Sequence, residues 1–178
     1  MSTVNPQSSD NALIGSDRPE AERFTLAPED REAIEHEMSH YDDPRAASIE
    51  ALKIVQKRHG WVPDGAIAEI GKVLGISAVD VEGVATFYNL IYRQPVGRHV
   101  IKICDSVGCY LTGYETVCEA ISRKLGIGLG ETTPDGRFTL LPICCLGACD
   151  KGPVLMIDDD THGNLTVEGI DQLLEQYA

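Results

Sequence analysis

Apolar residues in the first half of the chain recur every three or four positions, from about residue 27 to residue 93. This spacing places them on one face of a helix, so the pattern predicts amphipathic helices. We expect three helices at residues 28–41, 46–59 and 64–74, and a fourth that begins after Ser77 and continues to Pro95 and Gly97. Ser77 and Asp80 have the spacing of a capping box, with Asp in the usual Glu position. This half of the chain is therefore predicted to form a small helical bundle.

The pattern changes at Arg98, where apolar residues become grouped in short and partly alternating runs. These runs are typical of strands, and we expect strands at residues 99–104, 138–143 and 154–157. A helical pattern covers residues 114–125, a polar turn is predicted at 158–163, and a short strand and a closing helix are expected at 165–166 and 167–177. This order indicates a compact α/β (α+β) domain. We accordingly predict three regions, with bounds 1–24, 25–97 and 98–178.

Composition and charge limit the partners of the protein. Residues 1–24 are rich in Ser, Asn, Asp, Pro and Glu, and predict a disordered tail or an arm that binds a partner. The chain carries 15 Lys and Arg against 28 Asp and Glu, a formal net charge of −13. This balance argues against nucleic acid as a partner and suits docking onto a basic protein surface. No signal peptide or membrane-spanning stretch is evident, so we expect a cytoplasmic protein with reduced thiols.

Four of the six cysteines form two close pairs. Four residues separate Cys104 from Cys109, three separate Cys145 from Cys149, and thirty-five lie between the pairs. Four thiolates are soft ligands that suit either a zinc ion or an iron–sulfur cluster. Structural zinc sites use short spacings, whereas a two-iron cluster accepts one pair on each iron, so the spacing favours [2Fe–2S] and leaves zinc and inert thiols open. We expect all four cysteines in loops at strand ends.

Two further cysteines and several glycines accompany these pairs. Cys118 falls inside an expected helix and is interpreted as a small buried hydrophobic residue. Cys144 competes with Cys145 as a ligand, because it would form a four-residue spacing with Cys149. The flanking glycines either let the backbone approach a cluster closely or serve as ordinary turn residues; they are Gly108, Gly113, Gly147 and Gly152.

Two other motifs are not expected to carry chemistry. His36, Glu37 and His40 match the HExxH pattern of zinc proteases, but no later helix offers an obvious third ligand. We interpret them as a solvent-facing part of a helix. The glycine-rich residues 126–130 follow a helix instead of a strand, so they lack the context of a dinucleotide-binding turn. NAD binding by this chain is therefore not expected.

The segments that contain the paired cysteines are CDSVGCYLTGYE (104–115) and LLPICCLGACDKGPVLMID (140–158). They resemble the small [2Fe–2S] component, known as the E subunit, of bacterial NADH:quinone oxidoreductase, which is respiratory complex I. The resemblance continues in PDGRFTL (134–140) and DDDTHGNLT (158–166), and upstream in residues 43–76 and 80–97. It covers the chain except for the segment before about residue 24.

The resemblance implies a thioredoxin-like cluster domain behind an N-terminal helical bundle. It implies that Cys104, Cys109, Cys145 and Cys149 bind one [2Fe–2S] cluster, and that Cys144 is not a ligand. It also implies a larger partner subunit with FMN and the NADH site, further peripheral-arm subunits, and a position at the inner face of the cell membrane. The chain would exchange one electron with the FMN and would not be a catalyst by itself.

Three alternatives remain at this point. The first is the equivalent subunit of an NAD-linked formate dehydrogenase or an NAD-reducing hydrogenase, in which related modules occur. A free-standing ferredoxin-like carrier and a zinc-stapled interaction module without a redox role are the others.

Overall fold

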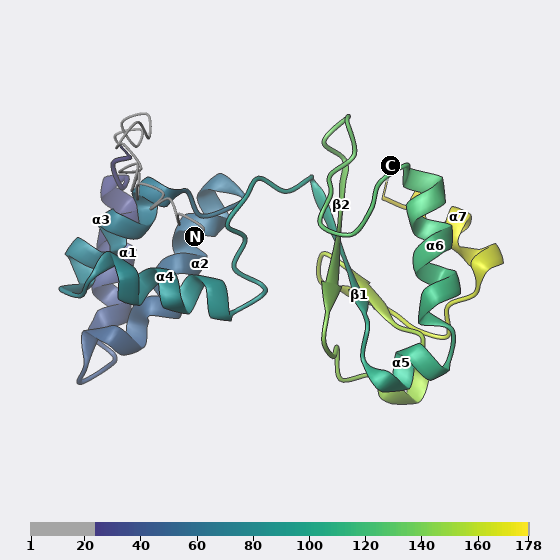
Figure 1. The fold of residues 1–178 in the computed structure, drawn as a ribbon. Coiled ribbons are helices and arrows are strands. Elements are labelled where there is room, and N and C mark those ends of the chain that lie inside the picture. The colour runs from purple at the N-terminus through teal and green to yellow at the C-terminus, as the bar shows by residue number, and fades with distance from the viewer. Residues whose placement is uncertain (1–23, 178) are drawn as a thin grey trace, which may run out of the picture.

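The computed structural model describes residues 24–177, and Figure 1 shows a helical part followed by a sheet part. The helical part contains α1 (Pro28–Met38), the 3-10 turn η1 (Pro44–Ala47), α2 (Ser48–His59), α3 (Asp64–Leu74) and α4 (Ala78–Phe87). The sheet part contains β1 (His99–Cys104), α5 (Val107–Leu111), α6 (Tyr114–Leu125), β2 (Phe138–Ile143), the 3-10 turn η2 (Cys149–Lys151), β3 (Leu155–Ile157), β4 (Asp160–His162) and α7 (Val167–Glu175). The predicted mixed fold class is confirmed. The predicted tail of residues 1–24 lies outside the described residues, except for Phe24.

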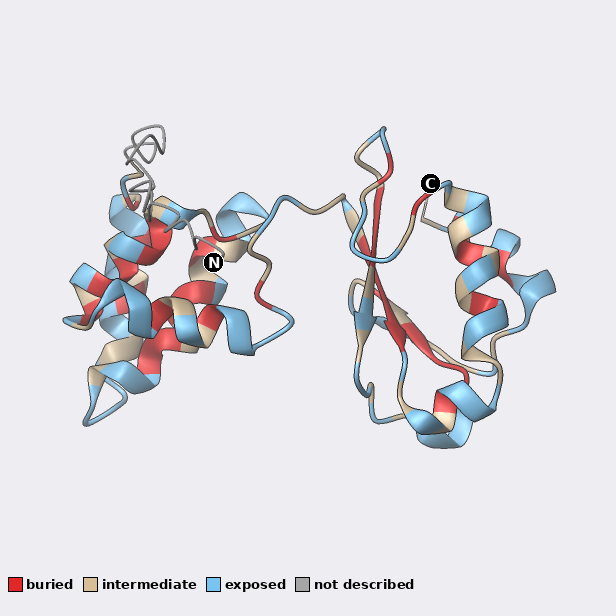
Figure 2. Cartoon of the chain, viewed as in Figure 1, coloured by how far each residue is buried: buried red, intermediate tan, exposed pale blue. Residues whose placement is uncertain are grey.

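The helical part packs around a hydrophobic core of its own. Ile34 of α1, Leu52 and Val55 of α2 and Ile70 of α3 are fully buried in it, and Figure 2 shows the buried positions on the inward faces of these helices. Their spacing of three or four residues is what the apolar pattern predicts for helices that share one core. Helix α1 ends at Met38, and is therefore shorter than the predicted helix at 28–41.

The start of α4 confirms the predicted cap. The Ser77 hydroxyl accepts a hydrogen bond from the Asp80 N–H (3.1 Å) and donates one to the Asp80 carboxylate (2.7 Å). Asp80 also pairs with Arg45 (2.8 Å). These interactions satisfy a free N–H at the helix start and lower the pKa of Asp80, the bond from Ser77 being the largest cause.

The end of α4 differs from the prediction, because the helix stops at Phe87 instead of near Pro95. The segment beyond it is captured by one side chain of α2. The Gln56 amide donates to the Leu90 carbonyl (2.9 Å) and accepts from the Tyr92 N–H (2.6 Å). The Tyr92 carbonyl in turn accepts from the Val62 N–H (2.8 Å). These bonds replace the helical hydrogen bonds that the apolar spacing alone would predict.

The sheet has the strand order β2-β1-β3-β4. Strand β1 is central; β2 runs parallel to it, whereas β3 runs antiparallel to both β1 and β4. Helices α6 and α7 lie on the same side of the sheet (Figure 1). Ile101 and Ile103 of β1 belong to the core of the sheet part, and successive strand residues point to opposite faces. Cys104, at the end of β1, therefore points to the opposite face from Ile103 and lies in a smaller buried cluster.

Two short elements of the sheet part differ from the predictions. The fourth strand is Asp160–His162, within the predicted polar turn, and not residues 165–166. Asp158 adopts a left-handed conformation (φ 53°), which allows a tight turn that pairs Ile157 with Asp160. Thr166 instead caps α7, since its side chain accepts from the Gly169 N–H. Helix α5 was not predicted, because a helix of five residues is too short to show a period.

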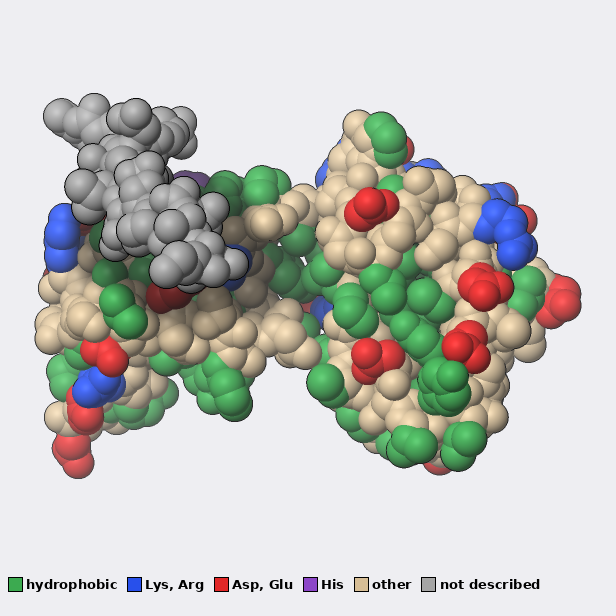
Figure 3. All heavy atoms as spheres, in the orientation of Figure 1, with side chains coloured by type: hydrophobic (Ala, Val, Ile, Leu, Met, Phe, Trp, Pro, Cys, Tyr) green, Lys and Arg blue, Asp and Glu red, His purple; other side chains and the backbone are tan. Residues whose placement is uncertain are grey.

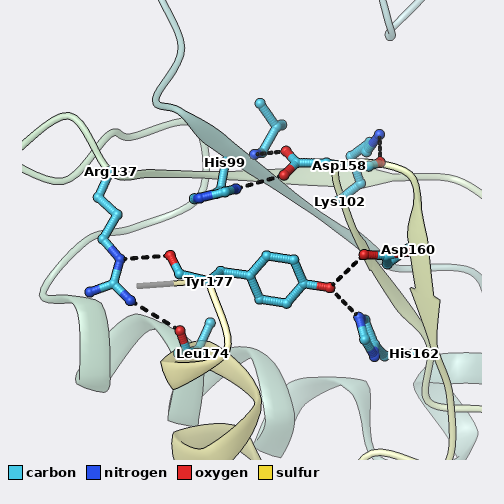
Figure 4. A network of polar contacts seen from close by, with 9 residues as sticks. His99, Lys102, Arg137, Asp158, Asp160, His162, Leu174 and Tyr177 are labelled. Carbon is cyan, nitrogen blue, oxygen red and sulfur yellow. Dashed lines mark hydrogen bonds and ion pairs between the residues drawn. The ribbon is translucent and has the colours of Figure 1, made fainter.

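A polar network holds the end of α7 against the sheet (Figure 4). The Arg137 guanidinium donates to the carbonyls of Leu174 and Tyr177, both at 3.1 Å, and so satisfies carbonyls at the helix end. The Tyr177 hydroxyl reaches Asp160 (3.1 Å) and His162 (2.8 Å) on β4. The C-terminal segment is thereby anchored at both edges of the sheet, to Arg137 next to the start of β2 and to β4.

Candidate metal centre

The first cysteine pair lies on regular structure. Cys104 is the last residue of β1, and Cys109 lies within α5, which corrects the prediction that all four cysteines lie in loops. Each is only 2% exposed, and they form a small buried cluster with Val154. The Cys104 backbone is fixed from the neighbouring chain segment, because its N–H donates to the Val154 carbonyl (3.1 Å). Both thiols therefore have positions set by the folding of the sheet part.

The second pair follows β2: Cys145 lies in the loop after the strand, and Cys149 is the first residue of the 3-10 turn η2. Cys145 and Cys149 are exposed, and their sulfur atoms lie 3.8 Å apart. Gly147 between them has a left-handed conformation (φ 80°), and its N–H points back to the Cys145 sulfur (3.4 Å). Only glycine adopts such a conformation without steric cost, so the turn that folds this pair together depends on it.

Electrostatic effects connect the two pairs through Cys104. Burial raises the pKa of Cys109, and the neighbouring Cys104 thiol raises it further. The Gly147 N–H, then the Cys149 thiol and a smaller contribution from Cys104, lower the pKa of Cys145. The hydrogen bond with Cys145 and the charge of that residue raise the pKa of Cys149, with Cys104 again contributing. The geometric link between the two segments is the Cys104 thiol, which lies 3.6 Å from the Cys144 carbonyl.

The two remaining cysteines occupy different surroundings. Cys144 is exposed, and its carbonyl accepts a weak hydrogen bond from the Cys104 thiol (3.6 Å). Cys118 of α6 is half-buried and packs against the core of the sheet part, so it is less buried than predicted. The only role that the described contacts give to Cys118 is in packing and in its interaction with Tyr114, where burial raises the tyrosine pKa to about 12 and Cys118 adds to the rise.

The donor set fits a two-iron cluster. A zinc ion and a two-iron cluster both accept four thiolates, but they group these ligands differently. The four thiols stand as two pairs, one buried and one exposed, and a [2Fe–2S] cluster takes one thiolate pair on each iron. The cluster with four thiolates carries negative charge, and backbone N–H groups stabilise such charge. The Gly147 N–H already has this role toward Cys145.

The HExxH residues lie at the end of α1, far along the chain from the thiols. The His36 and His40 rings stack edge to face with centroids 4.8 Å apart, and His40 pairs with Glu37 at 3.5 Å. His40 lies just beyond α1, which ends at Met38, and both histidines are exposed, in agreement with the interpretation of solvent-facing residues.

Sequence reasoning missed one part of the site, which is the exposed face of α5. Val107, Tyr110 and Leu111 are exposed there, on the helix that also carries the buried Cys109. The signal for this face was a short apolar run beside a metal-ligand spacing, VGCYL, which is too short for a helical period.

Comparison with known proteins agrees with this site. A family model described as thioredoxin-like [2Fe-2S] ferredoxin matches residues 34–178. The E subunit of the NADH-quinone oxidoreductase of Pseudomonas aeruginosa is 67% identical over 159 residues, which cover 89% of this chain and 96% of that protein. The corresponding E subunit from Escherichia coli K12 is 67% identical over 160 residues, with coverage of 90% and 96%.

The fold also occurs in a solved structure. The crystal structure of an NAD+-reducing [NiFe]-hydrogenase in its air-oxidized state matches with a TM-score of 0.61 and 23% identity. The match covers 71% of this chain and 22% of that chain, and at this identity it shows likeness of fold alone. The much higher identity to the E subunits favours them over the hydrogenase alternative. The chain belongs to the thioredoxin-like [2Fe–2S] ferredoxin family and, within it, to the E subunits of NADH-quinone oxidoreductases.

Proposed function

We propose that this protein is the electron-transfer subunit of an NADH-quinone oxidoreductase, and that it exchanges one electron with the FMN of a partner subunit. The proposal assigns Cys104, Cys109, Cys145 and Cys149 as the ligands of one [2Fe–2S] cluster. The observation that carries it is the contact of the Cys104 thiol with the Cys144 carbonyl (3.6 Å), which joins the two cysteine-bearing segments in a chain that is 67% identical to E subunits. The protein holds and positions the group, and the redox chemistry belongs to the cofactor.

Different elements of the chain would hold the two thiol pairs of the cluster. When bound, a [2Fe–2S] cluster supplies transfer of one electron at a time. Strand β1 and helix α5 hold one thiol pair in a buried position, and the turn at Gly147 folds the other pair together. Leu146 and Ala148 pack against the buried cluster of Cys104 and Cys109, and so limit the access of water to the inner thiols.

The exposed face of α5 is the surface that we assign to the flavin-bearing partner. Val107 is 74% exposed, Tyr110 51% and Leu111 81%, and Figure 3 shows hydrophobic side chains at this end of the sheet part. An apolar patch beside the thiols brings a docked partner close to the cluster, which short-range electron transfer requires. Exposed acidic residues near it, Asp105 and Glu115, suit a partner with a basic rim.

The helical part is assigned a second contact with the same complex. Phe87 and Tyr88, at the end of α4, are exposed and stack edge to face with ring centroids 5.1 Å apart. We treat residues 25–97 and 98–178 as separate domains, the first for assembly and the second for the cluster. None of the helices in the described part of the chain is long and apolar enough to cross a membrane. The assignment to the cytoplasmic inner face of the membrane follows from membership of the complex.

Anaerobic purification tests this function. The expected result is about two irons and two sulfides per chain, a rhombic one-electron EPR signal after reduction with dithionite, and copurification of a flavin-bearing subunit from its native host. A colourless protein with stoichiometric zinc would instead select the zinc-stapled module. A fully active monomer that needs no flavin subunit would select the free-standing carrier.

A further inference from the structure

Gly152, which follows η2, is crowded in a way that its backbone does not explain. Its dihedral angles (φ −58°, ψ 146°) are open to any residue, so no left-handed conformation requires glycine here. A Cβ atom at this position would lie 2.6 Å from the Thr112 hydroxyl oxygen and 3.6 Å from the Thr112 Cβ and Cγ2 atoms. Glycine is therefore required at position 152 because the Thr112 side chain occupies the space that a Cβ atom would need.

Thr112 is held in place on its own side of the contact. It closes α5, and the single hydrogen of its hydroxyl is shared between the carbonyls of Gly108 (3.0 Å) and Cys109 (3.1 Å). A β-branched side chain is stiff at χ1, and rotation of the hydroxyl away from Gly152 would break both of these hydrogen bonds. The crowded atom is thus the near end of a short, fixed side chain.

The two residues occupy matching positions relative to the thiols. Thr112 comes three residues after Cys109, and Gly152 comes three residues after Cys149. Cys109 belongs to the buried pair and Cys149 to the exposed pair. The contact continues along the chain, because a Cβ on Gly113 would lie 3.9 Å from the Pro153 ring. The segments that carry one thiol from each pair therefore touch directly at Thr112 and Gly152.

We propose that Thr112 and Gly152 are positioning residues that set the separation of the two thiol pairs, and thereby the retention and the electronic properties of the cluster. This inference rests on the proposed function. Relief of a 2.6 Å contact to the ordinary contact distance of 3.4 Å needs a movement of about 0.8 Å. Metal–ligand distances tolerate only about ±0.2 Å, so a movement of this size cannot be absorbed at the metal without loss of geometry.

The test uses the full chain with its cluster and compares four proteins with the wild type: Gly152→Ala, Thr112→Ala, the double variant of both, and Gly108→Ala. Gly108→Ala is the matched control, because it adds the same methyl group beside Cys109 in open space, with nothing within 4 Å. Three quantities are measured: the rate of iron release to a chelator, the g-values of the dithionite-reduced protein, and the midpoint potential. Far-UV circular dichroism confirms folding.

Gly152→Ala should release iron about tenfold faster or more, the lower end of the effects seen when residues behind metal ligands are changed, and its g-values and midpoint potential should shift. The double variant should return toward the wild type, because Thr112→Ala removes the atom that the new methyl group meets. If Gly152→Ala does not fold, the double variant alone tests the inference. Removal of the Thr112 hydroxyl should then restore both folding and cluster binding.

Gly152→Ala with wild-type iron release and an unchanged EPR signal would overturn the inference. A double variant no better than Gly152→Ala would overturn it as well, because the effect would not pass through Thr112. A wild-type protein that holds no iron and sulfide would show that the proposed function itself is wrong, and this outcome is distinct from a failure of the variants.

Discussion

The two cysteine pairs of this protein have nearly the same spacing in the sequence but opposite surroundings in the structure. Cys104 and Cys109 lie on β1 and α5 and are 2% exposed, whereas Cys145 in a loop and Cys149 at the start of η2 are exposed. The first pair is held by burial in a small apolar cluster with Val154. The second pair is held by a glycine turn and by the contact between its own sulfur atoms.

This difference indicates that folding alone prepares half of the site. Metal binding is coupled to folding wherever ligands are not yet fixed. We therefore expect that the buried pair reaches its position without metal and that the exposed pair gains most of its order from the cluster.

Replacement of one exposed ligand should abolish the cluster. Cys149→Ser removes a soft thiolate from one iron, and we expect loss of the EPR signal and of most bound iron. Cys118→Ser is the matched control, because it changes a half-buried cysteine outside both pairs. An intact EPR signal in Cys149→Ser would contradict the ligand assignment.

Alkylation of the metal-free protein should separate the pairs. Cys145 and Cys149 should react at least about tenfold faster with iodoacetamide than Cys104 and Cys109, since burial that costs only about 1.4 kcal/mol to open gives a tenfold difference. Peptide mass spectrometry after short labelling measures each rate. Equal rates would mean that the first pair is not fixed without metal.

The pH dependence of the same reaction sharpens the comparison. The thiolate is the reactive form, so a lower pKa brings the half-maximal rate to a lower pH. The pKa of Cys145 is lowered by the Gly147 N–H, whereas burial raises that of Cys109 and the bond with Cys145 raises that of Cys149. Cys145 should therefore reach its half-maximal rate at the lowest pH of the three. A common midpoint for all three would remove the assigned role of Gly147.

Stability measurements give the smallest effect. Cys104→Ser places a hydroxyl group in an apolar cluster, and should lower the free energy of unfolding of the metal-free protein by about 1–3 kcal/mol. Cys149→Ser should leave it unchanged, because that side chain is exposed. Urea unfolding of the two metal-free variants measures the difference. Equal stability would show that the buried pair contributes nothing to the folded core.

Much of the fold follows from local pattern, and the exceptions have identifiable causes. Helix α3 was predicted within its observed bounds, because its apolar period and the glycine after it agree. Helix α4 ends early because Gln56, more than thirty residues away, binds the segment that follows it. Such a long-range hydrogen bond leaves no sign in local periodicity.

The candidate site shows the same limit. The spacing of the cysteines indicates two pairs, and the four glycines beside them fit either close approach or ordinary turns. The structure separates these uses: Gly147 needs its left-handed conformation, whereas Gly152 needs the space next to Thr112. Which pair would be buried was not predictable, because it depends on the packing of Val154 against β1 and α5.

The capture of Leu90 and Tyr92 by Gln56 has a mechanical consequence. Arg93 also forms ion pairs with Asp64 and Glu82, both at 2.8 Å. The chain from Leu90 to Arg93 is therefore fixed to the helical part. On the other side, Gly97 and Arg98 are bonded to the β2 region. A hinge between the helical part and the sheet part is thereby confined to residues 94–96. The ring of Pro95 restricts the backbone of this short segment further.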